Sequence, residues 1–335
     1  MLIDNCYLDE QNKVVFPQLN DLKSIMELKK VNPNLKILVT LLPYSDRMRK
    51  IIYDNPKFDE LVDDIDAYIR KSGLDGIDID WEFPAWGKGS SSAEKGKFTE
   101  LVTKLFVKLK NNGTNNYLIT AATAGPYNIG QRGYDLPALA RYLDFIQIMN
   151  YDFHIYSKLQ PIVGFNAPLR AEPYEVFIAA KMNSVYSTEW YLKNGFPKEK
   201  LVFGIPTYGR GCTLLEKHLH YPYSPAVADS FLGSSYTYPN ACPLLKDPSF
   251  NLKWDNHAAS NYLINNNRDW VGIETARSVS VKAGYAGEIG LRGIMIFALY
   301  TDDYEGTCPG SKRKFWLTYS AKKAFLKKSN YVRSL

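Results

Sequence analysis

The stretch Leu74-Asp75-Gly76-Ile77-Asp78-Ile79-Asp80-Trp81-Glu82-Phe83-Pro84 decides how the rest of the chain is interpreted. In its second half, apolar residues alternate with carboxylates at Asp78, Asp80 and Glu82. Successive residues of a β-strand point to opposite faces, so this pattern predicts a strand whose apolar face packs against helices. The other face carries three carboxylates, each about 6–7 Å from the next. Pro84 is expected to end the strand, which leaves Glu82 at its C-terminal tip.

Two other interpretations of this stretch fit less well. An exposed edge strand protected by acidic residues would explain the carboxylates, but the segment Trp81-Glu82-Phe83-Pro84 is too apolar for such an edge. A calcium-binding EF-hand loop requires a glutamate at its twelfth position. Counted from Asp75 or Asp78, that position holds Trp86 or Gly89. Buried carboxylates this close together raise one another's pKa, so a buried strand would not keep all three ionised.

Composition places the chain among soluble globular proteins, with 335 residues, 45% hydrophobic and 23% charged. The net charge of +6 comes from the C-terminal segment 311–335, which holds eight basic residues and no acidic ones. The remainder is close to neutral, with 33 basic against 35 acidic residues. We therefore expect a solvated helix face at the C-terminus and no nucleic-acid partner.

No stretch is long and apolar enough to span a bilayer, and the start Met1-Leu2-Ile3-Asp4 lacks the pattern of a signal peptide. The 4 cysteines have no close metal-ligand spacing, so we expect no metal and no cofactor. These cysteines fit either a secreted protein with a disulfide or a reduced protein. The aromatic share of 14% would suit a carbohydrate-binding protein and would equally suit a large core.

Apolar runs of strand length alternate with longer helical patterns, which predicts βα units around a parallel sheet. The predicted strands are 3–8, 35–42, 74–84, 117–122, 145–152, 201–206 and 293–299. The predicted helices are 22–30, 58–71, 93–109, 136–143, 174–193, 276–289 and the basic C-terminal helix. This order predicts the α/β class and a (β/α)₈ TIM barrel formed by residues 1–211 and 273–335. The loop-rich segment 212–272 interrupts the alternation and is expected to be an insertion domain.

Polar and aromatic residues follow three of the predicted strands. They are Glu82, the pair Tyr151 and Asp152, and Tyr208. In (β/α)₈ barrels the chemistry lies at the C-terminal ends of the strands. We therefore expect these residues to share one site.

The spacing Asp-x-x-Asp-x-Asp-x-Glu, formed by Asp75, Asp78, Asp80 and Glu82, resembles the signature of family-18 glycoside hydrolases, the chitinases and their relatives. The resemblance covers residues 28–317, and further matching segments occur in the family's order. These segments are 133–135 with 143–145, 149–154, 164–169, 204–210 and 270–274. Asp75 alone could equally be a turn or capping residue.

The resemblance implies a hydrolase of β-1,4-linked N-acetylglucosamine polymers that works by substrate-assisted retaining catalysis. Glu82 would be the general acid, and the acetamido oxygen of the substrate would attack the anomeric carbon in place of an enzyme nucleophile. Asp80 would orient the acetamido group, and Asp78 would share a proton with Asp80. Tyr151 would donate a hydrogen bond to the acetamido carbonyl.

The resemblance also implies which residues contact the sugar. Asp152 and Met149 would line the subsite of Tyr151, while Phe297 stands where the family usually has a tryptophan floor. Tyr208 is placed among the substrate-binding residues, although Tyr208 and Arg210 are both expected to be structural rather than catalytic. Trp86 is either a sugar platform or a loop-packing residue. His154 is expected to be a buried structural histidine.

Several features depart from the family pattern. The strand 3–8 resembles the second strand of the family, so the first strand is missing. Thr40-Leu41-Leu42-Pro43 replaces Ser-x-Gly-Gly, and Ile155-Tyr156-Ser157 replaces Gly-Ser-Trp. These departures keep open a chitin-binding lectin that no longer turns over. The missing strand leads to the expectation that native residues precede this chain and that the protein is extracellular.

The resemblance further implies a disulfide between Cys242 and Cys308, with Cys6 and Cys212 left out of it. The expected partners are chitin or N-acetylglucosamine oligosaccharides, bound by a monomer with no membrane span.

Overall fold

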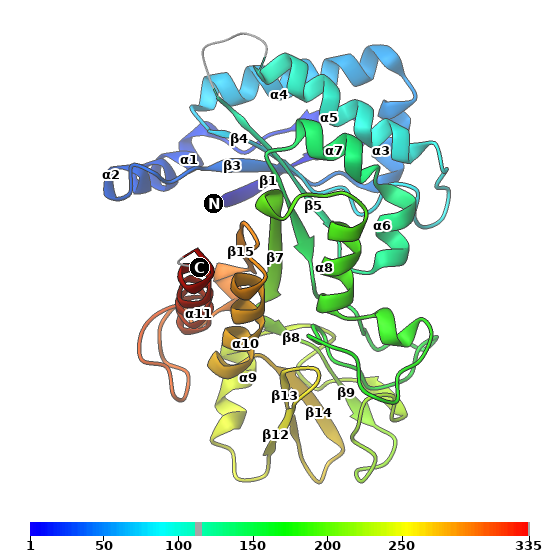
Figure 1. Cartoon of the computed structure of the whole chain (residues 1–335), viewed down its shortest axis with the longest axis vertical. Coiled ribbons are helices and arrows are strands. Elements are labelled where there is room, and N and C mark those ends of the chain that lie inside the picture. The colour runs from blue at the N-terminus through cyan, green and yellow to red at the C-terminus, as the bar shows by residue number, and fades with distance from the viewer. Residues whose placement is uncertain (111–115, 334–335) are drawn as a thin grey trace. The chain divides into compact units, whose positions relative to one another are not determined.

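The computed structural model describes residues 1–110 and 116–333 (Figure 1). The chain divides into two compact units. The first consists of residues 1–124, 128–147 and 193–200, and the second consists of the remaining segments. Strand β6 (Phe145–Met149) contains one of the boundaries, between Gln147 and Ile148.

The first unit is built around parallel strands. Strand β1 (Leu2–Leu8) pairs with β3 (Leu38–Leu41), β3 pairs with β4 (Gly76–Ile79), and β4 pairs with β5 (Leu118–Ala124). The short strand β2 (Val14–Val15) runs antiparallel to β1. Every residue of β3 and β4 is buried, which is typical of a parallel sheet covered on both faces.

Gly76 at the start of β4 illustrates how closely these strands approach one another. Its φ of 155° lies outside the range that side chains favour, and a Cβ atom would stand 2.0 Å from the carbonyl oxygen of Leu118. Only glycine fits this position, so Gly76, which follows the first aspartate of the acidic motif, has a packing function.

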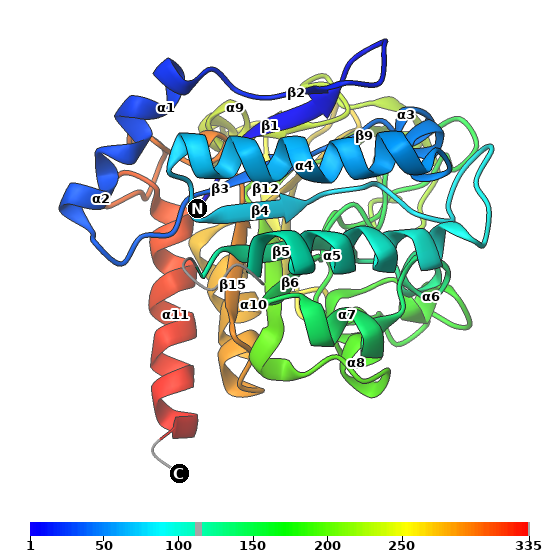
Figure 2. The same cartoon turned by 90° about the horizontal axis from the view of Figure 1, so that it is seen from above.

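Helices flank the strands of the first unit. They are α1 (Leu19–Met26), α2 (Leu28–Val31), α3 (Ser45–Ile52), α4 (Asn55–Ser72), α5 (Glu94–Lys110), α6 (Tyr127–Gly133), whose first residue lies in the second unit, and α7 (Leu136–Tyr142). Figure 2 shows α4 and α5 running alongside β4 and β5. Asp54 caps α4 by accepting from the backbone of Lys57, and Gly73 ends the helix in a left-handed conformation. The buried residues of α4 recur at helical spacing, so its apolar face covers the sheet.

The second unit contains a parallel pair and a separate antiparallel sheet. Strands β7 (Leu201–Pro206) and β15 (Gly293–Phe297) form the parallel pair. The antiparallel sheet has the order β10-β9-β14-β13-β12. Its strands are β9 (Gly211–Leu214), β10 (Ala226–Asp229), β12 (Asn251–Asp255), β13 (Ser260–Ile264) and β14 (Asp269–Ile273). The strands β8 (Tyr208–Gly209) and β11 (Tyr236–Thr237) form a small ribbon.

The remaining elements of the second unit are mostly helical. They are α8 (Ser184–Lys193), whose last residue lies in the first unit, α9 (Tyr238–Ala241), α10 (Ala276–Glu288) and α11 (Trp316–Arg333). Figure 1 shows α10 and α11 side by side. The basic side chains of α11 up to Lys328 are exposed, as expected for a solvated face.

The helix predicted over residues 174–193 is wrong in its first half. The structure has only the short 3₁₀ turn Ala179–Lys181 before α8 begins at Ser184. The carbonyl oxygen of the Asn183 side chain accepts from the backbone N–H of Tyr186 at 2.9 Å, which caps a new helix there. Phe177 has a φ of 54°, a left-handed conformation that interrupts any preceding helix.

One other expectation needs correction, and it concerns the acidic strand. The segment 212–272 contains turns and loops as expected, and between them lie the strands of the antiparallel sheet, which extends over 211–273. The acidic strand ends at Ile79 and not at Pro84, since the last ladder bond runs from the Asp80 N–H to the Leu41 carbonyl. The assignment of 212–272 as a separate domain stays a prediction.

The described part of the chain contains seven strands of the predicted α/β alternation, one fewer than a complete eight-stranded barrel. They are β1, β3, β4, β5, β6, β7 and β15. The predicted order of elements is therefore confirmed, including the strand 3–8, which the structure extends to Leu2–Leu8.

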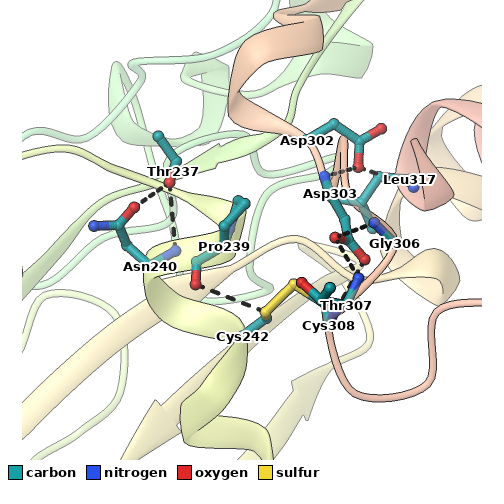
Figure 3. Close-up of a disulfide and its surroundings, with 10 residues drawn as sticks. All are labelled: Thr237, Pro239, Asn240, Cys242, Asp302, Asp303, Gly306, Thr307, Cys308 and Leu317. Carbon is teal, nitrogen blue, oxygen red and sulfur yellow. Dashed lines mark hydrogen bonds between the residues drawn. A yellow bond between two sulfur atoms is a disulfide. The ribbon is translucent and has the colours of Figure 1, made fainter. Parts of the chain in front are cut away.

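The predicted disulfide between Cys242 and Cys308 is confirmed, with a Cα–Cα distance of 5.7 Å (Figure 3). The carboxylate of Asp303 holds the loop around Cys308 by accepting from the backbone N–H groups of Gly306, Thr307 and Cys308. The bridge therefore joins the 3₁₀ turn Cys242–Leu245, directly after α9 (Tyr238–Ala241), to a loop that is already ordered by hydrogen bonds. Among the described residues, Cys6 and Cys212 are buried and take part in no disulfide.

Candidate active site

Asp78 lies at the centre of the first unit with no exposed surface. Its Oδ1 atom accepts hydrogen bonds from the Thr120 hydroxyl on β5 and from the Gln147 amide on β6, the latter at 2.8 Å. Burial raises the pKa of Asp78 to about 6, against the lowering effect of these two donors. The carboxyl therefore holds a proton more readily than an exposed aspartate does.

Asp80 follows on the same side of the chain and is partly buried, with its Oδ1 atom inaccessible to solvent. The pKa of Asp80 is raised well above its ordinary value. Burial is the largest cause, and the negative charges of Glu82 and Asp78 raise the pKa further. Within the described residues, Oδ2 of Asp78 and Oδ1 of Asp80 have no hydrogen-bond partner. Two buried acceptors without donors can be satisfied by a shared proton or by an N–H of a bound molecule.

Glu82 is exposed and lies three residues beyond the end of β4. The Trp81 indole N–H donates to the Ser45 hydroxyl at 2.9 Å, and this hydroxyl donates to the Glu82 carbonyl at 2.9 Å. The Trp81 ring is 1% exposed, so it anchors the chain in the core immediately before Glu82. The start of α3 thus fixes the backbone that presents the Glu82 carboxyl to solvent.

The loop after Glu82 is held by a buried ion pair. Glu94, which has no exposed surface, accepts from Arg49 Nε at 2.8 Å, and from the backbone N–H groups of Ala85 and Ser91 at 2.9 Å each. Both carboxylate oxygens of Glu94 therefore serve as acceptors. This arrangement fixes the loop on the other side of Glu82.

Trp86 belongs to this same loop. Its carbonyl accepts from Arg49 Nη2 at 3.1 Å, and the Arg132 guanidinium lies 5.3 Å from its ring centroid. These contacts favour the loop-packing interpretation of Trp86 over that of a sugar platform.

A cavity of about 660 Å³ lies next to Glu82 in the first unit. The ends of β1 and β3 and the start of α3 supply its walls. Its lining residues are Asn5, Tyr7, Asp9, Glu10, Leu42, Pro43, Tyr44, Ser45, Arg47 and Glu82. A volume in this range is typical of small-molecule sites.

The second unit gathers the remaining predicted residues at the ends of its strands. The rings of Tyr151 and Phe297 stack with centroids 5.6 Å apart, and Tyr208 meets Tyr151 edge-on at 5.8 Å. Phe297 is 42% exposed, as a residue available to a ligand would be. Met149, at the end of β6, is 8% exposed.

Asp152 has a φ of 58°, and its backbone N–H donates to the Asn166 side chain at 2.9 Å. Its carboxylate accepts from the Tyr208 hydroxyl at 2.7 Å and from Arg210 through Nε and Nη2 at 2.5 and 2.9 Å. Such a two-point contact fixes both the position and the charge of the carboxylate. The aromatic cluster of Tyr151, Tyr208 and Phe297 therefore has a fixed anion beside it.

The structure also describes the surroundings of Asp75 and His154. Asp75 accepts from the backbone N–H of Ile37 at 2.8 Å and forms ion pairs with Lys29 and Lys36 at 2.6 and 3.3 Å. Burial lowers the pKa of His154 to about 4. Its buried Nδ1 atom has no hydrogen-bond partner among the described residues, so the structural role expected of His154 stays a prediction.

Sequence reasoning missed several residues that support the site, namely Thr120, Gln147, Ser45 and Glu94. A signal for the first two exists. Thr120 and Gln147 are polar residues inside otherwise apolar strands, and a buried polar side chain needs a partner. No comparable signal identifies the other two.

The described residues include no group of three or more histidine, cysteine, aspartate or glutamate side chains suited to hold a metal ion. None of the described helices has both the length and the apolar character needed to cross a membrane.

Comparison with known proteins places this arrangement in a family. The family model for "Glycosyl hydrolases family 18" matches residues 4–302. Chitotriosidase-1 of Mus musculus is 30% identical over 318 residues, which are 90% of this chain and 64% of that protein. The chain spans 64%, 41% and 59% of the lengths of three curated relatives that it matches.

Solved structures with the same fold include the Group IV chitinase of Ostrinia furnacalis in complex with allosamidin, with a TM-score of 0.86 and 25% identity over 98% of this chain and 91% of that chain. Human YKL-39, described as a pseudo-chitinase with retained chitooligosaccharide binding, has a TM-score of 0.86 at 24% identity over 96% of this chain and 90% of that chain. The predicted (β/α)₈ barrel fold is thereby confirmed. Together with the match over residues 4–302, it shows that the chain belongs to glycosyl hydrolases family 18.

Proposed function

We propose that the chain is a chitinase-type glycosidase that hydrolyses β-1,4-linked N-acetylglucosamine polymers with retention of configuration. One observation carries this proposal above all others. The exposed residue Glu82 follows in sequence on Asp78, which has no exposed surface, and on Asp80, whose Oδ1 atom is buried. The pKa values of both aspartates are raised, mainly by burial. A proton donor beside desolvated carboxyls is suited to acid-assisted cleavage of a glycosidic bond.

In the proposed mechanism, Glu82 protonates the oxygen of the scissile bond and later removes a proton from the attacking water. The substrate's acetamido oxygen closes on the anomeric carbon, so no enzyme carboxylate forms a covalent bond. Asp80, whose Oδ1 has no partner within the described chain, accepts from the acetamido N–H. Asp78 exchanges a proton with Asp80 as the charge of the intermediate develops.

The aromatic cluster of the second unit is proposed to bind the sugar. Tyr151 donates to the acetamido carbonyl, and Phe297 offers a ring face in the position of the family's tryptophan. Asp152, Met149 and Tyr208 complete the contacts. This proposal is supported by the mutual stacking of Tyr151 and Phe297 and by the clamped carboxylate of Asp152.

The rival function is a chitin-binding lectin that does not turn over its ligand. The replacement of the family's tryptophan by Phe297 favours this rival, as does the likeness in fold to a pseudo-chitinase. Retention of Glu82 favours the enzyme. Release of reducing ends from chitin oligosaccharides separates the two, because a lectin binds the oligosaccharide and leaves it intact.

The decisive variant is Glu82→Gln, which keeps the shape of the side chain and removes its acidic proton. We expect kcat on a chitin oligosaccharide to fall by at least ~10²-fold with sugar binding retained. Glu60→Gln, an exposed position on α4, is the matched control. Equal turnover by wild type and Glu82→Gln would eliminate Glu82 as the acid.

We further propose an extracellular monomer that needs no cofactor, with residues 212–272 as the insertion domain. The disulfide between Cys242 and Cys308 supports an oxidising location.

A further inference from the structure

The cavity beside Glu82 has a distinctive charge. Its lining residues include the carboxylates Asp9, Glu10 and Glu82. Among the described residues that line it, Arg47 is the only base. The cavity is therefore negative even when Glu82 holds its catalytic proton.

The positive charge of Arg47 is directed at the cavity wall. Its Nη1 atom donates to the carbonyl of Leu8, and its guanidinium lies 4.9 Å from the centroid of the Tyr44 ring. A guanidinium engaged with a carbonyl and a ring face has less of its surface free for Asp9 and Glu10. The acidic character of the cavity is thus only partly offset.

The carboxylates of Asp9 and Glu10 differ in how firmly the structure holds them in place. Asp9 Oδ1 accepts from the backbone N–H groups of Gln11 and Lys13 at 2.9 and 2.8 Å, so this carboxylate is fixed in the turn after β1. Glu10 is exposed and stands next to it. The pair presents one fixed and one adaptable anion to a ligand in the cavity.

Aromatic rings complete the lining. Tyr7 is 44% exposed and Tyr44 is 62% exposed, and both line the cavity. Aromatic faces suit the apolar faces of a sugar ring and attract a cation at the same time. Anions combined with exposed rings are the chemistry that recognises an amino sugar.

We propose that this cavity selects a sugar unit with a free ammonium group, so that the preferred substrate is partially deacetylated chitin. The inference rests on the proposed glycosidase function and narrows its substrate. The unit at the scissile bond keeps its acetamido group, which supplies the nucleophile, while a neighbouring glucosamine unit occupies the cavity. Its ammonium group lies near Asp9 and Glu10.

The test compares two oligosaccharides of equal length, one fully acetylated and one with glucosamine at a single non-reacting unit. The ratio of their kcat/KM values measures the selection, and we expect wild type to favour the glucosamine substrate. Glu10→Gln should lower this ratio by about 2- to 5-fold, the effect of one exposed charge pair. Raising the salt concentration should lower it as well, because exposed charges are screened.

Glu60 is exposed and lies outside the cavity, so Glu60→Gln should give the same ratio of kcat/KM values as wild type. The inference is overturned if wild type favours the fully acetylated substrate. It is equally overturned if the ratio is the same in wild type and Glu10→Gln.

If the proposed glycosidase function is wrong, the result is different, because neither oligosaccharide would be cleaved. In that case calorimetric binding of the same two oligosaccharides to the wild-type chain tests the cavity. Tighter binding of the glucosamine oligosaccharide, weakened by salt and by Glu10→Gln, supports the inference. Equal or weaker binding of it refutes the inference.

Discussion

Replacing Asp78 by asparagine should change how the stability of the protein depends on pH. The carboxyl of Asp78 is fully buried, and its pKa is raised from the ordinary value of 3.8 to about 6. Below about pH 4 the group is protonated in both the folded and the unfolded chain. As the pH rises towards 6, the unfolded chain loses this proton first, so wild type becomes less stable.

The magnitude follows from the pKa difference. Each pKa unit corresponds to about 1.4 kcal/mol, so a rise from 3.8 to about 6 corresponds to a loss of ~3 kcal/mol between pH 4 and neutral pH. Asparagine resembles the protonated carboxyl, because its oxygen can still accept from Thr120 and Gln147. Asp78→Asn should therefore match wild type near pH 4 and exceed its stability at pH 7.5.

Urea unfolding monitored by tryptophan fluorescence at pH 4, 5, 6 and 7.5 measures this effect, with the disulfide kept intact. The midpoint concentrations of wild type and Asp78→Asn should diverge as the pH rises. Asp46→Asn, an exposed position at the start of α3, controls for the loss of one negative charge. Parallel profiles for wild type and Asp78→Asn would refute the reasoning.

Two further predictions concern stability. Replacing Cys242 and Cys308 together by serine should lower the free energy of unfolding by about 4 kcal/mol according to the loop-entropy model, since the bridge spans 66 residues. An unchanged melting temperature in calorimetry would contradict this. Glu94→Gln should lower the free energy of unfolding by about 3 kcal/mol and also lower turnover, because Arg49 loses its buried partner and the new amide N–H₂ faces backbone donors. Denaturant unfolding measures the first effect and reducing-end release measures the second. Wild-type values in both assays would show that the ion pair does not fix the loop.

The sequence by itself determined the alternation of strands and helices, since periodicity depends only on local apolar spacing. It also determined which carboxylates share one side of the chain, because residues Asp78 and Asp80 are two apart in an extended segment. The pairing of Cys242 with Cys308 followed from resemblance and proved correct. The start of the helix at Ser184 could not be predicted well from the sequence. The apolar pattern continues through the residues before Ser184, but the left-handed backbone conformation of Phe177 keeps that part of the chain out of a helix.

Only the tertiary structure decided the chemistry of the acidic motif. Thr120 and Gln147 bond to Asp78 from positions 42 and 69 residues away, and Arg49 reaches Glu94 across 45 residues. No local pattern encodes these contacts. A pKa depends on the loss of water around a carboxyl and on the donors that replace it. The loss of water and the hydrogen-bond donors both depend on how distant strands pack together. The residues of the motif could therefore be found in the sequence, while their protonation could not be predicted from it.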